Sequence, residues 1–343
     1  MVNANAMQDR ATDSVLFALP ATREFGTAVA QSAGVELGTL EARSFAGGEH
    51  KIRPLVSVRG RRVYVVQSLH GQSAPDGATP GSANDRLCEL LFFAGAVHDA
   101  GASGVCAIAP YLAYSRKDRR TKARDPANSR YVAQLIEVVG IDHVLSVDVH
   151  NPAAFDNAFR IRADHLTTTA LFARHFARRL GKGIAAVVSP DLGGGKRAQL
   201  LREALERHLG RAVDFGVVEK RRSQGVVSGH QLMGELAGRA VVIIDDLIST
   251  GTTLQRAARA CREAGATAVY VGATHALFSS GSEALLRDPL IDEIAVTDCV
   301  PIHPQATAAA GERLVVLPAS TLVGEAVRCL EGHGSLTQLL ELQ

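Results

Sequence analysis

The sequence has no tryptophan, only five cysteines, and almost no excess of charge of either sign. Its 37 lysines and arginines are matched by 35 aspartates and glutamates, which argues against a protein that coats nucleic acid. The cysteines are dispersed and form no Cys-x-x-Cys pair, so we expect reduced thiols and a cytoplasmic location. No apolar run approaches the roughly 20 residues that cross a bilayer, and no basic segment precedes an apolar one near the start. We therefore expect no membrane span, no signal peptide and no nucleic-acid partner.

The sequence is instead rich in short apolar runs that alternate with helical patterns along 343 residues, a length sufficient for two domains. The helical pattern is clearest at 252–265, where Gly265 is the expected stop. Its predicted apolar face, at spacing i, i+3, i+4 and i+7, is Leu254, Ala257, Ala258 and Cys261. The expected strands are 62–68, 104–111, 143–150, 185–191, 240–246 and 268–276. Strands that alternate with helices predict βαβ units, hence an α/β fold with mainly parallel sheets flanked by helices.

Two pairs of stretches resemble each other, which indicates an internal duplication. Residues 100–115 align with 264–279 at an offset of 164, and residues 60–69 align with 238–247 at an offset of 178. The difference of 14 is the length of the Gly-, Pro- and Ser-rich stretch 70–83, which we interpret as an extra loop in the first copy. Chance similarity between strands of like composition is the alternative. We favour a duplicated α/β domain, and the expected domains are 14–160 and 161–343.

The stretch VVIIDDLISTGTTL, residues 241–254, places two adjacent carboxylates where a buried strand ends. Parallel sheets bind ligands at the carboxyl ends of their strands, so Asp245 and Asp246 lie at the expected mouth of a site. The small residues that follow offer backbone N–H groups, and a helix that begins near Thr252 adds its positive end, which suits a phosphate. Carboxylates accept hydrogen bonds from sugar hydroxyls, so the pattern indicates a pentose 5-phosphate site; a threonine-capped helix, the alternative, leaves the acidic pair unexplained. The expected sugar-phosphate residues are Asp245, Asp246, Ser249, Thr250, Gly251, Thr252 and Thr253.

Four other stretches carry residues whose chemistry the pattern alone leaves open. Six of the nine residues in 116–124 are basic, which is typical of a nucleic-acid patch or of a solvated loop. Asp191 precedes three glycines that let the backbone approach a ligand closely at a strand-to-helix turn. The basic run 220–222 indicates either a solvated face or a mobile loop that delivers positive charge. His150 by itself is typical of a capping or core histidine, because magnesium prefers oxygen ligands.

Together these stretches resemble the ribose-phosphate pyrophosphokinases, the synthetases of phosphoribosyl pyrophosphate. VVIIDDLISTGTT resembles the phosphoribosyl-binding motif that this family shares with the type I phosphoribosyltransferases. Five further segments match family motifs, in the family's order. They are RSFAGGEHKIR (43–53), APYLAYSRKDRRTKARDP (109–126), VLSVDVHNP (144–152), VVSPDLGGGKRA (187–198) and VEKRRSQGVVSG (218–229).

The resemblance implies two tandem phosphoribosyltransferase-like domains of type I in a homo-oligomer, with the ATP site shared between subunits. It implies a Mg²⁺-dependent transfer of pyrophosphate from ATP to the 1-hydroxyl of ribose 5-phosphate. By the same resemblance, His150 and Asp191 hold the metal, while Lys220 and Arg222 are catalytic and Arg222 also contacts ribose 5-phosphate. The ATP-binding residues that it implies are Phe45, Gly47, Gly48, Glu49, Arg116 and Lys117.

The sequence departs from the family's usual residues at several of these positions. Gly47 replaces an Asp or Asn, Lys117 replaces a glutamine associated with the adenine, and Ser249 and Thr252 replace an Asp and a Gly. Nucleotide preference, allosteric effectors and oligomer size therefore stay open. Two other functions also stay open: a phosphoribosyltransferase, against which the duplication argues, and a non-catalytic regulatory homologue, against which retention of the metal and catalytic residues argues.

Overall fold

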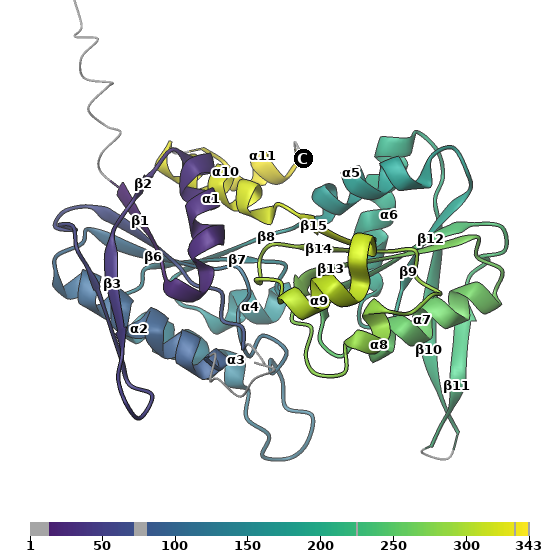
Figure 1. Ribbon diagram of the computed structural model, residues 1–343, viewed down its shortest axis with the longest axis horizontal. Coiled ribbons are helices and arrows are strands. Elements are labelled where there is room, and N and C mark those ends of the chain that lie inside the picture. The colour runs from purple at the N-terminus through teal and green to yellow at the C-terminus, as the bar shows by residue number, and fades with distance from the viewer. Residues whose placement is uncertain (1–13, 72–80, 224–225, 333, 342–343) are drawn as a thin grey trace, which may run out of the picture. The chain divides into compact units, whose positions relative to one another are not determined.

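Figure 1 shows the computed structural model of the protein, which describes residues 14–71, 81–223, 226–332 and 334–341. For residues 219–223 and 226–231 the backbone is described and the side chains are not. The chain forms two compact units. The first contains the chain up to Leu166, Cys299–Pro301 and the residues from Ser320 to the last helix, and the second contains Thr167–Asp298 and Ile302–Ala319. Within the described ranges, no helix has the length and apolar character needed to cross a membrane.

The first unit is built on a six-stranded sheet in the order β2-β1-β5-β6-β7-β8, in which all neighbours run parallel. Its strands are β1 (Ser14–Ala18), β2 (Glu36–Leu37), β5 (Arg62–Val66), β6 (Gly104–Ala109), β7 (His143–Val147) and β8 (Arg162–Leu166). Two further strands, β3 (Leu40–Ser44) and β4 (His50–Pro54), form a separate antiparallel hairpin. Its helices are α1 (Arg23–Ala33), α2 (Ala83–Asp99), α3 (Asn128–Val138), α4 (Pro152–Ala158), α10 (Ala319–Glu331) and α11 (Leu336–Glu341), with a 3-10 turn at Pro20–Thr22. Helices α2 and α3 lie on one side of this sheet, and α1 and α10 lie on the other (Figure 1).

The second unit is built on a seven-stranded sheet in the order β11-β10-β9-β12-β13-β14-β15. Only the pair β10–β11 is antiparallel among these described strands. The strands are β9 (Ala185–Ser189), β10 (Asp214–Ser223), β11 (Val226–Met233), β12 (Ala240–Ile248), β13 (Ala268–Ala276), β14 (Glu293–Thr297) and β15 (Leu314–Leu317). The helices are α5 (Thr169–Leu180), α6 (Gly195–Leu209), α7 (Thr252–Glu263), α8 (Glu283–Leu286) and α9 (Pro304–Ala310), with a 3-10 turn at Gly311–Arg313.

Strand β12 is buried on both faces, which explains its uninterrupted apolar run. Val241 and Ile243 belong to a hydrophobic cluster with α7, while Val242 and Ile244 belong to a second cluster with α5 and α6. The apolar face predicted for α7 is the face that the structure buries. The sheet thus has helices on both sides, and its carboxyl edge is the part left for ligands.

The two sheets repeat one order of strands, β1-β5-β6-β7-β8 in the first and β9-β12-β13-β14-β15 in the second. The stretches that align in the sequence fall on β5 and β12 and on β6 and β13, which hold the same positions in their sheets. The predicted α/β fold with two duplicated, mainly parallel domains is therefore confirmed. The extra stretch 70–83 lies between β5 and α2, and residues 72–80 of it fall outside the described residues.

Two stretches lie outside the domain to which the boundary at 160/161 assigned them. Strand β8 pairs with β7 and so completes the first sheet. The C-terminal helix α10 also packs on the first unit, because Gly324 comes so close to Ser32 on α1 that a side chain there would clash. The phenolic hydroxyl of Tyr64 on β5 donates to Glu331 of the same helix at 2.6 Å. Contacts between residues distant in the sequence, which periodicity does not reveal, decide this assignment.

Candidate active site

The second unit gathers acidic side chains at the carboxyl edge of its sheet. Strands β9 and β12 are parallel neighbours, so Asp191 after β9 and Asp245 near the end of β12 come to the same edge. Arg197, in the first turn of α6, approaches this edge too, with its Nη1 3.7 Å from Oδ1 of Asp245. Ligands of parallel sheets bind at this edge, which makes it the candidate sugar-phosphate site.

The acidic pair has unequal surroundings. Asp246 is buried with 6% exposure, whereas the side chain of Asp245 keeps 23%. The backbone N–H of Asp246 donates to Oδ1 of Asp245 at 2.9 Å. Burial and the neighbouring charge of Asp246 raise the pKa of Asp245 to about 8, while Arg197 opposes this shift. The two carboxyls therefore titrate as a pair that holds a proton near neutral pH, until hydroxyl donors or a cation favour full ionisation.

The loop after β12 has the geometry of an anion site at a helix start. Gly251 adopts φ of 79° as the residue before α7, and a Cβ there would lie 2.6 Å from the side chain of Leu285. Because glycine has no side chain to cap the helix, the first N–H groups of α7 stay available to a ligand. The hydroxyls of Thr250 and Thr252 lie 3.1 Å apart, and that of Ser249 lies 3.1 Å from the Ser279 hydroxyl.

Asp191 is held at the turn between β9 and α6. Its Oδ1 accepts the backbone N–H of Gly194 at 3.0 Å, and the Ser189 hydroxyl donates to its carbonyl oxygen at 2.6 Å. A Cβ on Gly194 would lie 2.8 Å from that hydroxyl, so glycine keeps the turn compact. A carboxylate has about four acceptor positions, so Asp191 can still bind a hard cation such as Mg²⁺.

The first unit carries two of the predicted segments at the carboxyl ends of β6 and β7. Arg116 and Lys117 are exposed in the loop after β6, and His150 is exposed after β7. Asn151 donates from Nδ2 to Oδ2 of Asp118 at 2.8 Å, which ties the two loops together. The basic loop and the histidine therefore belong to one edge of the first sheet.

Backbone strain marks the same edges. Among the described residues, every non-glycine residue with positive φ follows the carboxyl end of a parallel strand. These residues are Tyr114 (62°) and Arg124 (69°) after β6, Asp148 (41°) after β7 and Phe278 (36°) after β13. Such conformations cost of order 1–3 kcal/mol each and gather at functional sites, so they point to these loops.

The predicted segment Phe45–Glu49 forms the turn of the β3–β4 hairpin. The backbone N–H of Phe45 donates to the carbonyl of Glu49 at 2.8 Å. Gly47 and Gly48 have φ of 90° and 88° with open space around them, and Phe45 is 49% exposed. The hairpin therefore presents an aromatic ring and a carboxylate to solvent, and its role at ATP stays a prediction.

Lys220 and Arg222 lie on β10, which pairs with β11, and their side chains lie outside what the structure describes. The pairing shifts register between Arg221 and Arg222. Irregularities of this kind re-aim side chains and are frequent beside active sites. The predicted catalytic role of both residues stays a prediction.

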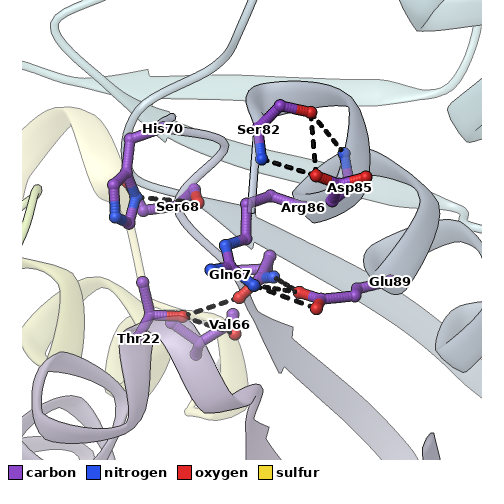
Figure 2. A network of polar contacts seen from close by, with 9 residues as sticks. All are labelled: Thr22, Val66, Gln67, Ser68, His70, Ser82, Asp85, Arg86 and Glu89. Carbon is purple, nitrogen blue, oxygen red and sulfur yellow. Dashed lines mark hydrogen bonds and ion pairs between the residues drawn. The ribbon is translucent and has the colours of Figure 1, made fainter. Parts of the chain in front are cut away.

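The first unit's counterpart of the phosphate loop, at the carboxyl end of β5, is filled by side chains (Figure 2). Arg86 donates from Nη1 to both oxygens of Glu89, at 2.9 and 3.0 Å. Gln67 donates to Glu89 at 2.6 Å and accepts the hydroxyl of Thr22 at 3.0 Å. This network occupies the place that the acidic pair and its loop have in the second unit.

Beside this network, His70 is buried, and burial lowers its pKa to about 4, so the ring is neutral. Its Nδ1 lies 3.2 Å from the carbonyl oxygen of Ser68 (Figure 2). The stretch that the sequence marked as an extra loop therefore begins inside the core of the first unit.

The predicted metal ligands lie in different units, His150 in the first and Asp191 in the second. Among the side chains that the structure describes, no group of three or more His, Cys, Asp or Glu is placed to hold a metal ion. A site for Mg²⁺ does not need such a group, because magnesium in phosphate-transferring enzymes is bound by one or two carboxylates plus substrate oxygens and waters. The oxygen donors of Asp191 and the acidic pair fit this requirement, and the contribution of His150 stays a prediction.

Arg197 is the charged neighbour of the acidic pair that the sequence interpretation did not single out. It lies in the quoted segment VVSPDLGGGKRA, six positions after Asp191 and just inside a predicted helix. A cation at the amino-terminal turn of a helix opposes the helix dipole, which is an unfavourable position unless an acidic partner lies nearby. This unfavourable position of Arg197 was the one feature of the sequence from which an acidic partner could have been inferred.

Comparison with known proteins identifies relatives over nearly the whole chain. Residues 14–140 match the model of the N-terminal domain of ribose phosphate pyrophosphokinase, and residues 173–341 match that of the phosphoribosyl synthetase-associated domain. Ribose-phosphate pyrophosphokinase 1 of Streptococcus pneumoniae serotype 4 is 33% identical over 97% of this chain and 98% of its own. The Streptococcus agalactiae serotype III protein of the same name is 33% identical over 95% and 97%. The crystal structure of phosphoribosylpyrophosphate synthetase from Mycobacterium smegmatis superposes with a TM-score of 0.83 at 30% identity, covering 94% of this chain and all of that one.

Proposed function

The chain belongs to the ribose-phosphate pyrophosphokinase family, and we propose that it transfers pyrophosphate from ATP to the 1-hydroxyl of ribose 5-phosphate with Mg²⁺. The products are phosphoribosyl pyrophosphate and AMP, for use in nucleotide biosynthesis. The observation that carries the proposal is the acidic pair beside an uncapped helix start at one edge of the second sheet.

Ribose 5-phosphate is chemically matched to this edge. Its phosphate suits the N–H groups from Ser249 to Thr253, at the positive end of α7. Its ring hydroxyls suit the carboxylates of Asp245 and Asp246, which accept hydrogen bonds from hydroxyl donors. A sugar phosphate held at both ends presents its 1-hydroxyl in a fixed direction, which is the positioning that phosphoryl transfer requires.

The reaction breaks the bond between the α- and β-phosphorus groups of ATP, while the 1-hydroxyl oxygen forms a new bond to the β-phosphorus. Negative charge grows on the departing AMP and must be neutralised, chiefly by positioned cations. Lys220 and Arg222, on the strand pair with the register shift, are the proposed cations. Burial and Asp246 raise the pKa of Asp245, and hydrogen bonds from the sugar hydroxyls would favour its ionised form.

Magnesium, when bound, would neutralise the phosphate oxygens of ATP, and Asp191 with His150 are its proposed ligands. The hydrogen bond from Gly194 fixes the orientation of the Asp191 carboxylate before any ligand binds. Such pre-orientation lowers the entropic cost of assembling the site.

For ATP we propose Phe45, Gly47, Gly48 and Glu49 of the hairpin turn together with Arg116 and Lys117 of the loop after β6. The exposure of Phe45 supports this role, since an exposed aromatic ring at a turn can stack on an adenine. We propose further that the chain works as a cytoplasmic homo-oligomer, in which the hairpin of one copy completes the ATP site of another.

The test is an assay of the purified protein with ribose 5-phosphate, Mg²⁺ and ATP, GTP, CTP or UTP in turn. We expect nucleoside monophosphate to form only when both sugar phosphate and Mg²⁺ are present. Binding of ribose 5-phosphate without turnover on any nucleotide would contradict the proposal and point to a regulatory homologue. Consumption of phosphoribosyl pyrophosphate with a nucleobase would point instead to a phosphoribosyltransferase.

A further inference from the structure

The loop that follows β13, residues 277–282, lies directly against the proposed phosphate loop, residues 249–253. The backbone N–H of Phe278 donates to the carbonyl oxygen of Ile248 at 3.0 Å. The backbone N–H of Ser279 donates to the carbonyl oxygen of Ser249 at 3.1 Å. These two bonds carry the contact between β12 and β13 past the ends of both strands. A segment outside the motif VVIIDDLISTGTTL therefore borders the residues that are proposed to hold the phosphate.

The side chains of Ser249 and Ser279 also meet. Their hydroxyl oxygens lie 3.1 Å apart, either of them can be the donor, and both residues are partly buried. A hydroxyl has one O–H donor and two acceptor positions, so the serine that accepts in this pair keeps its own O–H for a ligand. Hydrogen bonds in such a chain polarise one another, and a phosphate dianion favours the arrangement in which the last O–H donates to it.

The backbone that leads to Ser279 is strained. Phe278 adopts φ of 36°, which is rare for a bulky residue, while its ring packs against the hydrophobic core of the second unit. In the internal alignment of the two halves Phe278 corresponds to Tyr114, whose φ is 62°. Soon after this position the first unit has Arg116 and Lys117, two residues proposed for ATP, and the second unit has Ser279. The repeated strain thus marks turns that precede proposed substrate residues in both units.

We propose that Ser279 is a positioning residue for the phosphate of ribose 5-phosphate. Its hydroxyl donates to the oxygen of Ser249, so that the O–H of Ser249 is directed to a phosphate oxygen. Ser279 acts through Ser249, from which it is separated by 30 positions in the chain. The inference rests on the proposed function, because it assumes that residues 249–253 hold the sugar phosphate.

A purely structural role for the Ser279 hydroxyl, as a tie between the two loops, has different consequences. The backbone bonds of Phe278 and Ser279 do not depend on that hydroxyl, so alanine at position 279 leaves them in place. A tie would therefore lower stability without changing the affinity for ribose 5-phosphate. A role through Ser249 makes the two serines interdependent, so that loss of both weakens binding no more than loss of Ser249 alone.

The experiment compares the full-length wild type with Ser279→Ala, Ser279→Thr, Ser249→Ala and the double alanine variant. Ser280→Ala is the matched control, because this exposed serine is the next residue of the same loop. For each protein, kcat and KM for ribose 5-phosphate are measured at saturating ATP and Mg²⁺. Calorimetry gives the dissociation constant of ribose 5-phosphate without nucleotide, and urea unfolding reports stability.

We expect Ser279→Ala to raise both KM and the dissociation constant for ribose 5-phosphate about three- to tenfold, with kcat changed less than about twofold. Ser279→Thr keeps a hydroxyl and should stay within about twofold of the wild type. The double variant should bind ribose 5-phosphate as weakly as Ser249→Ala, and Ser280→Ala should behave as the wild type.

Wild-type affinity in Ser279→Ala would overturn the inference, whether or not its stability falls, and would leave the proposed function intact. The same holds if the losses in the two single alanine variants multiply in the double variant, since the serines then act independently. A loss in Ser279→Thr as large as that in Ser279→Ala would also overturn it. A wild type that neither binds nor converts ribose 5-phosphate would instead remove the proposed function itself.

Discussion

Replacing Asp245 by asparagine should stabilise the protein at alkaline pH while weakening the binding of ribose 5-phosphate. The pKa of Asp245 is raised from 3.8 to about 8 in the folded chain, first by burial and then by the charge of Asp246. A carboxyl with a raised pKa contributes most to stability when both states are protonated, below about pH 4. That contribution is lost as pH rises through about 8, because the folded state must then accept a charge that the unfolded chain already carries.

The size of the effect follows from the shift. Four pKa units correspond to an upper limit of roughly 5–6 kcal/mol, at 1.36 kcal/mol per unit. The side chain of Asp245 retains 23% exposure and shares its proton with Asp246, so we expect a smaller gain, about 1–3 kcal/mol at pH 9. Near pH 4 the gain should be small, since the carboxyl is then protonated in the folded state and only about half ionised in the unfolded chain.

Urea unfolding followed by circular dichroism, at several pH values from 4 to 9, measures this difference in free energy of unfolding. Glu263→Gln, an exposed change on α7, serves as the control and should show no such trend. Calorimetry of the same proteins should show that Asp245→Asn binds ribose 5-phosphate about 10- to 100-fold more weakly, for loss of a hydrogen bond to a charged group. A difference in stability between wild type and Asp245→Asn that is the same at every pH would refute the raised pKa of Asp245.

Four further substitutions test other parts of the site. Gly251→Ala places a Cβ at a positive φ and against the side chain of Leu285, so it should lower the free energy of unfolding in urea by about 1–3 kcal/mol. The same change should abolish tight binding of the sugar phosphate. Unchanged binding by calorimetry would contradict the role of residues 249–253 in holding the phosphate. Glu89→Ala leaves the largely buried guanidinium of Arg86 without its carboxylate partner and should destabilise the protein by about 3 kcal/mol. A loss below about 1 kcal/mol in the same assay would mean that the network is dispensable. Lys117→Gln supplies an acceptor as well as donors and should sharpen the preference for ATP in competition kinetics, whereas a wild type already strict for ATP would count against it. Lys220→Ala should bind ribose 5-phosphate normally but turn over about 10²- to 10³-fold more slowly in steady-state kinetics, and near-wild-type turnover would remove it from the mechanism.

The sequence predicts the fold well where one periodicity dominates. The run that became β12 is apolar because both faces are buried, and the spacing that became α7 marks one buried face. Duplication was also visible, since strands at equivalent sheet positions face similar surroundings and so keep similar residues. The membership of α10 in the first unit was not predictable, because it depends on a close approach of Gly324 to Ser32 across nearly the whole chain.

For the candidate site, the sequence predicted which residues lie at strand ends but not how they influence one another. Asp191 and Asp245 were predicted separately, and only the pairing of β9 with β12 brings them to one edge. The ion pair of Arg197 with Asp245 joins residues 48 positions apart, a separation that no local pattern reports. The network at β5 was not predicted, because its members come from Thr22, from Gln67 and from α2. Only the neighbouring stretch 70–83 was interpreted, as an extra loop.

The most direct measurement follows the phosphorus atoms of ATP. Purified protein is incubated with Mg²⁺, ribose 5-phosphate and ATP, and the products are identified by phosphorus NMR. We expect the β- and γ-phosphorus atoms to move together onto the oxygen at carbon 1 of the pentose, with one AMP formed for each sugar converted. Formation of ADP with ribose 1,5-bisphosphate, or an unchanged mixture in which the protein still binds ribose 5-phosphate, would contradict pyrophosphate transfer by this chain.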